Sequence, residues 1–420
     1  MPEQESNIIV IGGGISGLTA ATEAAEAGYT VTILERDPFL GGRVSRMNKY
    51  FPKLCPPTCG LEINYRRVKL NDRISVYTMS EVEKISGQAG SYEVDVKLNP
   101  RYINDKCTGC NACTEACPVE IPNDFNAGLD KKKAAFIRTE QSFPHQYVIE
   151  KSACKSDCGA KCKEACKYDA IDLEMQAETL KIKAGSIVLA TGWKPYDAKK
   201  IDNLGFGTNP NIITNAIMER IASGNGPTGG KMTRPGDGKE AKKVAFVQCA
   251  GSRDENHLAY CSAVCCLASL KQITYITDQY PDAEVYMFYI DIRTPGTSFE
   301  RFYNMVKDKE NVKLIKGKVA AVSTGSNGDV IVEAEDILAG EKVQVTVDMV
   351  VLATGMQPEV ADRKLPSDIK INENGFAVIG NDQKGIYAAG CAKDPVDVAK
   401  SVQGATGAAL KAIQTVGRLS

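Results

Sequence analysis

The cysteines are the residues of this chain whose types and spacing suggest chemistry most directly, and there are 15 of them in 420 residues. The densest group lies in RYINDKCTGCNACTEACPVEIP, where Cys107, Cys110, Cys113 and Cys117 are separated by two, two and three residues and a proline follows. In ferredoxins this spacing wraps three thiolates around one 4Fe-4S cluster and directs the fourth to a neighbouring cluster. A zinc site is disfavoured, because zinc ligands of this kind come as two separated pairs.

A second group, in CKSDCGAKCKEACKYDAIDL, is the expected partner of the first. Three residues separate each of its cysteines from the next. Its ending is similar to the second half of a ferredoxin, with Lys167 in place of proline. Cysteines at every fourth position also share one face of a helix, so a distorted or absent second cluster stays open. Cross-ligation would place Cys107, Cys110, Cys113 and Cys166 on one cluster, and Cys154, Cys158, Cys162 and Cys117 on the other.

A third group lies at the end of an apolar strand in AKKVAFVQCAGSRDENHLAYCSAVCC. Thiolates are favoured here, because Arg253 is adjacent and a helix is expected to begin nearby. A further iron-sulfur cluster is the preferred interpretation; redox-active thiols and buried structural cysteines are the alternatives, and His257 is more typical of a solvated loop than of a ligand. The candidate ligands are Cys249, Cys261, Cys265 and Cys266.

The three remaining cysteines are candidate redox thiols. Cys55 and Cys59 lie in YFPKLCPPTCGLE, where two prolines break the stretch, whereas disulfide-reducing flavoproteins carry their cysteine pair on a helix. A structural loop, or an iron ligand donated to the third group, is an equally open interpretation. Cys391 lies in a later segment, where a small buried thiol is as well supported as a redox role. No residue pattern indicates an acid-base dyad or a nucleophile.

A nucleotide-binding motif precedes all of these cysteines. In NIIVIGGGISGLTAATEAAEAGYTVTILERD an apolar strand runs into Gly-x-Gly-x-x-Gly, then a helix pattern, then a strand that ends at Glu35. The glycines allow close approach to a pyrophosphate at the positive end of the helix, and Glu35 can accept hydrogen bonds from ribose hydroxyls. The GGR segment that follows is similar to the FAD signature of flavoproteins with two dinucleotide domains, so FAD is predicted rather than NAD.

An internal repeat supports two dinucleotide-type halves. KIKAGSIVLATGWKP at 181–195 and QVTVDMVVLATGMQP at 344–358 both predict a polar strand, a turn, an apolar strand and Ala-Thr-Gly. GIYAAGCAKDPVDVAKSV then resembles a second FAD motif, with a helix that begins near Val396 to Ser401 and stabilises negative charge on a reduced flavin. The candidate FAD-binding residues are Gly12, Gly14, Gly17, Glu35, Arg36, Gly41, Gly42, Arg43, Val82, Ala190, Thr191, Gly192, Gly390, Cys391 and Val396.

These motifs need an α/β fold to position them. We predict a flavoprotein with two dinucleotide-binding domains, similar to thioredoxin and glutathione reductases, with an inserted ferredoxin-like iron-sulfur domain. The strand at 91–98 should pair with one at 179–185 across the insertion. In the second dinucleotide-type domain the third cysteine group replaces a glycine fingerprint, so the nicotinamide site is expected to be lost. The predicted parts are 1–98 (FAD-binding), 99–172 (iron-sulfur insertion), 173–240 (FAD-binding and linker), 241–348 (second dinucleotide-type) and 349–420 (FAD-binding).

Composition narrows the partners. The 51 basic and 52 acidic residues nearly balance, and no strongly basic block indicates nucleic acid. The start MPEQESN lacks the basic and apolar regions of a signal peptide, and no apolar run reaches the roughly 18 to 20 residues that cross a bilayer. We therefore expect a cytoplasmic protein, without a membrane span of its own, whose cysteines are not structural disulfides.

Several segments together resemble the flavoprotein A subunit of heterodisulfide reductases over nearly the whole chain. They are GGGISGLTAA, the GGR segment, FPKLCPPTCGLEIN, CTGCNACTEACPVEIP, GPTGGKMTRPGDGKEAKKVAFVQCAGSRD, YCSAVCC and AAGCAKDPVD. Within that family, FPKLCPPTCGLEIN and a chain that stops after the flavoprotein core look most like the A subunit of the quinone-interacting membrane-bound oxidoreductase complex. The resemblance associates the third cysteine group with an additional cluster, giving FAD and two or three 4Fe-4S clusters in all.

The same resemblance implies an oxidoreductase subunit that passes electrons between the quinone pool and adenylylsulfate reductase in dissimilatory sulfate reduction. Its partners would be a second flavoprotein/iron-sulfur subunit, a membrane quinone-binding subunit that holds it at the inner membrane, and adenylylsulfate reductase. The alternative is a heterodisulfide reductase-like soluble flavoprotein that acts on a disulfide or thiol substrate or in electron bifurcation. A scaffold with vestigial flavin motifs is a third class, and it would bind no FAD.

Overall fold

The structure is a computed structural model that describes residues 3–154, 158, 160–363, 369–379 and 384–419. Its contacts divide the chain into two units. Unit 1 comprises Met1–Ser45, Thr58–Trp193 and Pro358–Ser420, and unit 2 comprises Arg46–Pro57 and Lys194–Gln357. Among the described residues, none of the helices combines the length and apolar character that a bilayer span requires.

Unit 1 is built on a seven-stranded sheet in the order β3-β2-β1-β10-β5-β4, with β23 also paired to β10. The carboxyl-terminal ends of β1 and β10 are apolar runs, which suits parallel strands that are buried on both faces. Ile9, Ile182 and Leu189 lie in the core of this sheet. The strands are β1 (Glu3–Ile11), β2 (Val31–Leu34), β3 (Ile74–Tyr77), β4 (Ser80–Gln88), β5 (Ser91–Leu98), β10 (Glu178–Leu189) and β23 (Ile386–Ala388).

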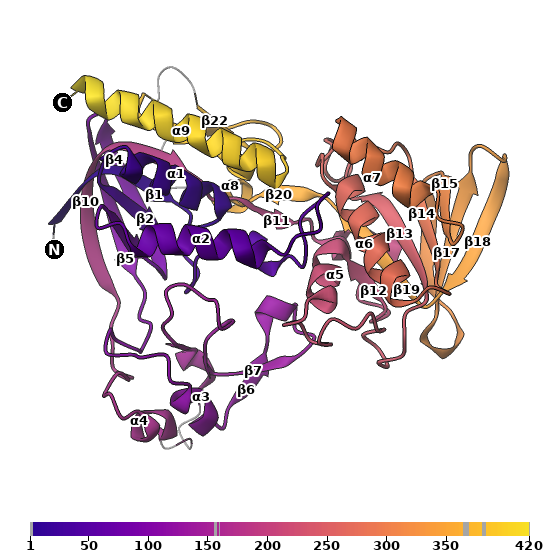
Figure 1. The fold of residues 1–420 in the computed structure, drawn as a ribbon, viewed down its shortest axis with the longest axis horizontal. Coiled ribbons are helices and arrows are strands. Elements are labelled where there is room, and N and C mark those ends of the chain that lie inside the picture. The colour runs from indigo at the N-terminus through magenta and orange to yellow at the C-terminus, as the bar shows by residue number, and fades with distance from the viewer. Residues whose placement is uncertain (1–2, 155–157, 159, 364–368, 380–383, 420) are drawn as a thin grey trace. The chain divides into compact units, whose positions relative to one another are not determined.

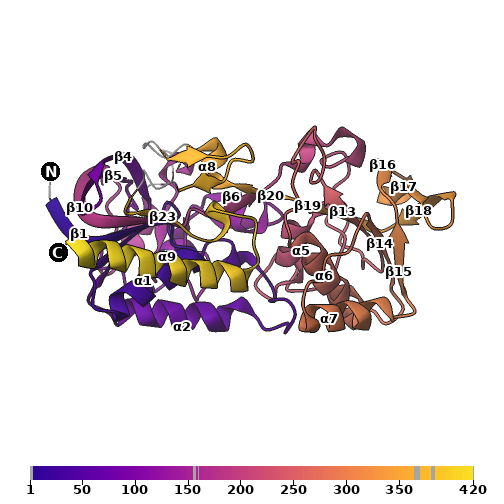
Figure 2. The same cartoon turned by 90° about the horizontal axis from the view of Figure 1, so that it is seen from above.

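Three helices accompany this sheet: α1 (Ile15–Glu26), α2 (Pro57–Lys69) and α9 (Val398–Leu419). Helices α1 and α9 lie side by side in both views (Figure 1, Figure 2). Small buried residues allow this close packing, among them Ala21 and Ala24 on α1 and Ala405 and Ala412 on α9. Helix α1 ends before Gly28, whose φ of +99° suits glycine.

The predicted pairing across the insertion is confirmed. β5 runs antiparallel to β10, with Leu98 opposite Glu178 and Tyr92 opposite Ala184. The turn predicted inside 181–195 is wrong, because β10 is one continuous strand held by β1 on one side and β5 on the other. In the second copy of the repeat, β18 (Glu341–Val347) and β19 (Met349–Thr354) are separate strands, as predicted.

The insertion leaves the sheet after β5 and returns before β10. An antiparallel bridge between Ile103 and Ile171 closes its base, and two short helices, α3 (Ala112–Ala116) and α4 (Lys161–Ala165), contact each other (Figure 1). It has its own small core, which includes Ala134 and Tyr147. The remaining elements are β6 (Glu120–Pro122), β7 (Lys131–Lys133), β8 (Ala135–Phe136) and β9 (Val148–Ile149).

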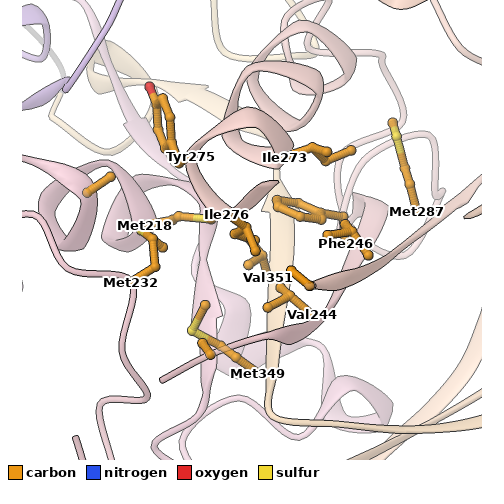
Figure 3. Packing of buried hydrophobic residues seen from close by; sticks show 14 of the residues in the cluster. Met218, Met232, Val244, Phe246, Ile273, Tyr275, Ile276, Met287, Met349 and Val351 are labelled. Carbon is orange, nitrogen blue, oxygen red and sulfur yellow. The ribbon is translucent and has the colours of Figure 1, made fainter. Parts of the chain in front are cut away.

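Unit 2 contains a parallel five-stranded sheet in the order β12-β19-β13-β14-β15 and a three-stranded antiparallel sheet, β16-β17-β18. Figure 3 shows side chains of β13 and β19, such as Phe246 and Val351, packed against Ile273 and Ile276 of α6 and Met218 of α5. The elements are β12 (Ile212–Thr214), β13 (Lys243–Ala250), β14 (Glu284–Tyr289), β15 (Val312–Lys316), β16 (Val319–Thr324), β17 (Val330–Asp336), α5 (Asn215–Ala222), α6 (Cys265–Gln279) and α7 (Thr297–Lys307).

The two units divide the chain differently from the predicted parts. β12, α5 and β19 lie in unit 2, although 194–240 and 349–357 were predicted with the FAD-binding domain. The reason is the pairing of β19, which inserts between β12 and β13. Short elements complete the fold: β11 (Trp193–Pro195) paired with β20 (Met356–Pro358), α8 (Glu359–Asp362), and β21 (Lys370–Ile371) paired with β22 (Ala377–Val378).

The segment 46–57 also belongs to unit 2, although the sequence suggested the FAD-binding domain. The ring of Phe51 lies 5.0 Å and 4.8 Å from the rings of Phe299 and Phe302 on α7. Lys271 on α6 donates a hydrogen bond of 2.6 Å to the carbonyl of Lys49 and forms an ion pair with Glu219. Buried aromatic and charged contacts therefore hold this loop to α6 and α7.

Candidate functional site

The glycine-rich loop after β1 is built for close backbone approach. Gly12 has a φ of +109°, and a Cβ on it would lie 2.3 Å from the carbonyl oxygen of Ala190. A Cβ on Gly17 would lie 1.8 Å from the carbonyl oxygen of Gly12. Both positions therefore need glycine for the packing of the loop itself. Gly14 differs, since the nearest atom to a Cβ there would be 3.8 Å away, so the space beside this residue is open.

Helix α1 begins directly after this loop with Gly14 as its N-cap residue. Gly14 has no side chain to bond the first-turn N–H groups, and no acidic residue lies in that turn. The first-turn N–H groups of the helix are therefore directed toward the open side of the loop with the positive end of the helix dipole. This is the arrangement that binds a pyrophosphate.

Glu35 lies beside the loop at the end of β2. Its carboxylate accepts hydrogen bonds from the backbone N–H groups of Gly13 at 2.6 Å and Asp37 at 2.8 Å. Burial raises the pKa of Glu35, and the nearby charge of Asp37 adds to the rise, while the two hydrogen bonds oppose it. A carboxylate so placed is ready to accept from ribose hydroxyls.

The Gly-Gly-Arg segment packs on the same loop. The N–H of Gly41 donates to the carbonyl of Gly13 at 2.9 Å. The guanidinium of Arg43 lies 5.5 Å from the Trp193 ring centroid and donates to the carbonyl of Trp193 at 3.1 Å. Burial lowers the pKa of Arg43, which stays positively charged at neutral pH.

The Ala-Thr-Gly segment and the C-terminal motif supply the remaining residues of the candidate FAD site. The buried hydroxyl of Thr191 has no hydrogen-bond partner among the described residues, and a Cβ on Gly192 would meet open space. Gly390 approaches the start of α1, since a Cβ on it would lie 2.1 Å from the hydroxyl oxygen of Ser16. The orphaned hydroxyl, the open glycine faces and the uncapped helix fit FAD, which would be held by Gly12 to Gly17, Glu35, Gly41 to Arg43, Ala190 to Gly192 and Gly390.

The other predicted cofactor residues have more ordinary surroundings. Arg36 forms an ion pair of 3.7 Å with Glu359, and Val82 lies on β4 opposite Val96. Cys391 is buried, and its thiol donates to the carbonyl of Val396 at 3.4 Å. Burial raises the pKa of Cys391, which favours a neutral thiol.

Helix α9 begins with a cap that bears on the predicted dipole effect. It starts at Val398, close to the predicted position. The carboxylate of Asp397 accepts a hydrogen bond from the N–H of Lys400 at 2.8 Å. The positive end of this helix is therefore already partly matched by a negative charge.

The first cysteine group is brought together in the insertion. Cys113 is buried on α3, burial raises its pKa to about 12, and the adjacent thiols of Cys107 and Cys110 add to the rise. Burial raises the pKa of Tyr147, and the charges of these three cysteines add to the rise. The Tyr147 hydroxyl donates a hydrogen bond to the side chain of Asn111 at 2.9 Å. Thiolates at these three positions would repel one another unless a cation such as iron bound them.

Cys117 packs in the same small core as Cys162 of the second cysteine group. Burial raises the pKa values of Cys154 and Cys162, and in both cases the thiols of Cys117 and Cys158 contribute to the rise. Cys117 therefore lies near the second group, although it belongs to the first motif in sequence. The chemistry of this donor set, four cysteine sulfurs, fits a 4Fe-4S cluster.

The two halves of the insertion repeat one local structure. α3 follows Asn111 with a φ of +68°, and α4 follows Ala160 with a φ of +54°. Cys113 and Cys162 are each the second residue of their helix, and Cys117 and Cys166 follow the helix ends in extended conformation. This internal symmetry matches Cys166 with Cys117 and supports its place on the first cluster.

The alternative of one long helix through the second group does not hold for the described residues. Cys154 has extended backbone angles, and α4 begins only at Lys161; residues 155–157 and 159 lie outside the described part. Within that part, no three Cys, His, Asp or Glu side chains stand in a metal-ligating arrangement as they are. The ligand assignments therefore remain predictions.

The third group gathers between the end of β13 and the start of α6, as predicted. Burial raises the pKa of Cys265, and the thiols of Cys266, Cys249 and Cys261 add to the rise. Burial also raises the pKa of Cys249, against the lowering effect of Arg253. Four cysteines and an arginine lie between the end of β13 and the first turn of α6, and this donor set fits a further cluster.

The same loop follows β13, where a nicotinamide-binding domain would carry its glycine fingerprint. A Cβ on Gly355 would lie 2.2 Å from the hydroxyl of Ser252 and 2.7 Å from Leu258. His257 is hydrogen-bonded to the hydroxyl of Tyr196 at 2.9 Å, in keeping with a loop histidine.

Cys55 and Cys59 are both exposed. Pro57 is the first residue of α2 and does not interrupt it, so Cys59 lies in the first turn of a helix, contrary to the broken stretch that was predicted. Proline suits this position because its missing N–H has no partner there in any case.

Sequence reasoning missed several residues that line the insertion. Arg101 and Tyr147 are buried beside the first cysteine group, and the ring of His145 lies next to Gly109, where a Cβ would be 2.6 Å away. His145 and Tyr147 come from a later part of the chain, so the cysteine spacing gave no sign of them. Arg101 opens the segment that carries the cysteine motif, and its place shortly after β5 was the one available signal.

Two family models match the parts of the chain that hold the glycine-rich loop and the first cysteine group. The family model for NAD(P)-binding Rossmann-like domains matches residues 10–61, and that for 4Fe-4S binding domains matches residues 100–123. T. acidophilum thioredoxin reductase superposes with a TM-score of 0.54 at 14% identity, covering 99% of this chain and 100% of that one. Lactococcus lactis thioredoxin reductase gives 0.54 at 12% identity, covering 98% and 99%. These structures confirm the predicted fold.

Curated relatives match far more closely in sequence. The A subunit of the ferredoxin/F(420)H(2)-dependent CoB-CoM heterodisulfide reductase of Methanosarcina acetivorans is 37% identical over 98% of this chain and 53% of its own length. The A subunit of the H(2):CoB-CoM heterodisulfide,ferredoxin reductase of Methanothermobacter thermautotrophicus is 36% identical over 97% and 63%. A protein of Archaeoglobus profundus, named as similar to the heterodisulfide reductase A subunit, is 34% identical over 97% and 66%.

The chain thus spans between about half and two thirds of the length of these relatives. The match nevertheless extends over nearly all of this chain, through the glycine loop, the insertion and the third cysteine group. The chain belongs to the family of flavoproteins that includes the A subunit of heterodisulfide reductases.

Proposed function

We propose that this protein is an FAD and iron-sulfur electron-transfer subunit of an oxidoreductase complex. The observation that carries the proposal is that, within unit 1, the insertion packs against the segment that leads into Gly-Gly-Arg, which is predicted to bind FAD. The N–H of Leu40 donates to the carbonyl of Phe143 at 2.8 Å, one residue before Gly41. The ring of Phe143 stacks on Tyr65 at 5.5 Å, and the Tyr65 hydroxyl donates to the carbonyl of Leu40 at 3.0 Å.

This arrangement gives the residues of the chain distinct roles. The start of α1 would bind the pyrophosphate, Glu35 would orient the ribose, and Arg43 would hold the Gly-Gly turn through Trp193. Bound FAD would supply a two-electron store that exchanges single electrons with iron-sulfur clusters. The cysteine groups Cys107/Cys110/Cys113/Cys166 and Cys117/Cys154/Cys158/Cys162 would each hold one cluster, and Cys249/Cys261/Cys265/Cys266 a third.

The finer proposal is that the complex passes electrons between the quinone pool and adenylylsulfate reductase. It rests on the resemblance of FPKLCPPTCGLEIN to the A subunit of the quinone-interacting membrane-bound oxidoreductase complex. The partners would then be two further subunits of that complex, one a flavoprotein with iron-sulfur clusters and the other a membrane protein that binds quinone. The chain itself would work on the cytoplasmic side, held at the inner membrane by those partners.

Anoxic affinity purification from the native cell tests this proposal. Copurification of a membrane quinone-binding subunit, with reduction of the flavin by a quinol or its reoxidation through adenylylsulfate reductase, would support it. The alternative is a heterodisulfide reductase-like subunit that acts on a disulfide or in bifurcation; the names of the relatives and the exposure of Cys55 and Cys59 favour it. Copurification of heterodisulfide reductase subunits with disulfide reduction would overturn the quinone proposal in its favour.

A further inference from the structure

Arg101 is a buried arginine at the point where the insertion leaves the sheet. Its side chain is almost fully excluded from solvent, with the residue 8% exposed. One side of the guanidinium donates to the carbonyls of Gln146 and Tyr147, at 2.8 Å and 3.2 Å. The other side donates to the carbonyl of Pro38 and, at 2.9 Å, to the hydroxyl of Thr78.

All four hydrogen-bond acceptors of Arg101 are electrically neutral. No carboxylate in the described part of the chain forms an ion pair with it. Burial lowers the pKa of Arg101 to about 10, so the group still carries its charge at neutral pH. Removing such a charge from water costs several kcal/mol, and proteins normally offset the cost with an opposite charge.

A neighbouring arginine, Arg138, has the carboxylate partner that Arg101 lacks among the described residues. Arg138 is also buried, and both guanidiniums lie 5.4 Å from the centroid of the Phe39 ring. Arg138 has a counter-charge, because it pairs with Asp37 at 3.0 Å. Two buried arginines thus share one aromatic ring, and only one of them has a carboxylate.

The first cysteine group lies where the counter-charge of Arg101 would be expected. Arg101 donates to the carbonyl of Tyr147, and Tyr147 packs in one small core with Cys113. The Tyr147 hydroxyl donates to the side chain of Asn111, the residue after Cys110. Cys107 packs against the same small core. A 4Fe-4S cluster with four thiolate ligands carries a net negative charge, which becomes more negative by one unit when the cluster takes up an electron.

We infer that Arg101 is the counter-charge of the cluster held by Cys107, Cys110 and Cys113, and that it raises the midpoint potential of that cluster. The inference rests on the proposed function, because it requires the cluster. Reduction adds one electron and no proton, so a fixed positive charge nearby stabilises the reduced state more than the oxidised state. Arg101 is a positioning residue in this account, since it acts on the cluster and reacts with nothing.

The test is an anoxic redox titration with dithionite as reductant, followed by electron paramagnetic resonance of the full chain. In Arg101→Gln, one cluster signal should shift to a lower potential by at least a tenfold change in the reduced-to-oxidised ratio, which is about 59 mV for one electron. The signals of the other clusters should stay in place. Arg101→Lys, which keeps the charge, should retain most of the wild-type potential.

A second pair of variants keeps Arg101 and its packing. Thr78→Asp places a carboxylate against the guanidinium and should lower the same potential, whereas the neutral matched control Thr78→Asn should not. An unchanged potential in Thr78→Asp with full iron content would overturn the inference, as would an equal shift in Arg101→Lys and Arg101→Gln. Wild-type protein without cluster signals would instead overturn the proposed function.

Discussion

The carboxylate of Glu35 accepts a hydrogen bond of 2.6 Å from the backbone N–H of Gly13. This bond joins the end of β2 to the glycine-rich loop after β1, two segments that a dinucleotide must contact together. Burial holds the pKa of Glu35 above its ordinary value. The bond therefore holds in place the carboxylate that we expect to accept hydrogen bonds from the ribose hydroxyls.

Replacing Glu35 with Gln should weaken FAD binding. A hydrogen bond to a charged group contributes about 1.5 to 3 kcal/mol, which is roughly a 10- to 150-fold loss of affinity. Equilibrium titration of the FAD-free protein, followed by flavin fluorescence, measures the change. Wild-type affinity in the variant would contradict the role given to Glu35.

The same carboxylate predicts a pH dependence. Ribose hydroxyls donate to the ionised form, so FAD binding should lower the raised pKa of Glu35 and release a proton. The affinity should therefore fall as the pH drops through the raised pKa of the free protein, and level off below the pKa of the complex. Glu35→Gln should remove this dependence; a pH profile identical to that of the wild type would assign it to another group.

Gly14→Ala should separate folding from FAD binding. A Cβ there meets no protein atom closer than 3.8 Å, so the fold should survive, but the methyl group would enter the space before α1. We expect a melting temperature of the FAD-free protein close to that of the wild type, with FAD binding lost. Gly224→Ala is the matched control, because a Cβ there also meets open space and the residue belongs to unit 2. Retention of FAD by Gly14→Ala would show that the pyrophosphate does not bind at the start of α1.

The sequence was most informative where a motif depends on local spacing. The glycine loop, Glu35 and the ferredoxin spacing follow from short-range geometry, and the pairing of 91–98 with 179–185 follows from strand patterns. It was least informative about long-range packing. Segment 46–57 lies in unit 2 because Phe51 and Lys49 find partners more than 200 residues away, on α7 and α6, and no local pattern encodes such contacts.

Arg101 shows the same limit within the site. Its importance comes from what surrounds it, four neutral acceptors and a buried position, and none of these can be read from the residues beside it. The missing turn in β10 has a similar cause, since pairing on both edges overrides the weak strand tendency of Lys183 to Gly185.

Cysteine substitutions should distinguish the two clusters of the insertion. Cys117→Ser should disturb the cluster shared with Cys154 and Cys162, although Cys117 belongs to the first motif in sequence. Cys107→Ser should disturb the other. Electron paramagnetic resonance of the reduced variants should show a different signal lost or altered in each; the same signal lost from both would contradict cross-ligation.

NADH and NADPH should not bleach the flavin of the isolated chain. The segment from the end of β13 to the first turn of α6 carries four cysteines in place of a glycine fingerprint. Anoxic absorbance spectroscopy after mixing measures the reduction, with dithionite as the control that must bleach the flavin. Rapid bleaching by either nucleotide would show that a nicotinamide site remains.

The cofactor content of anoxically purified protein tests the central claim most directly. Iron, acid-labile sulfide and FAD should be counted per chain in one preparation. The account predicts one FAD and about eight to twelve irons with matching sulfide, for two or three 4Fe-4S clusters. Fewer than about four irons per chain, or no bound FAD, would contradict an electron-transfer flavoprotein.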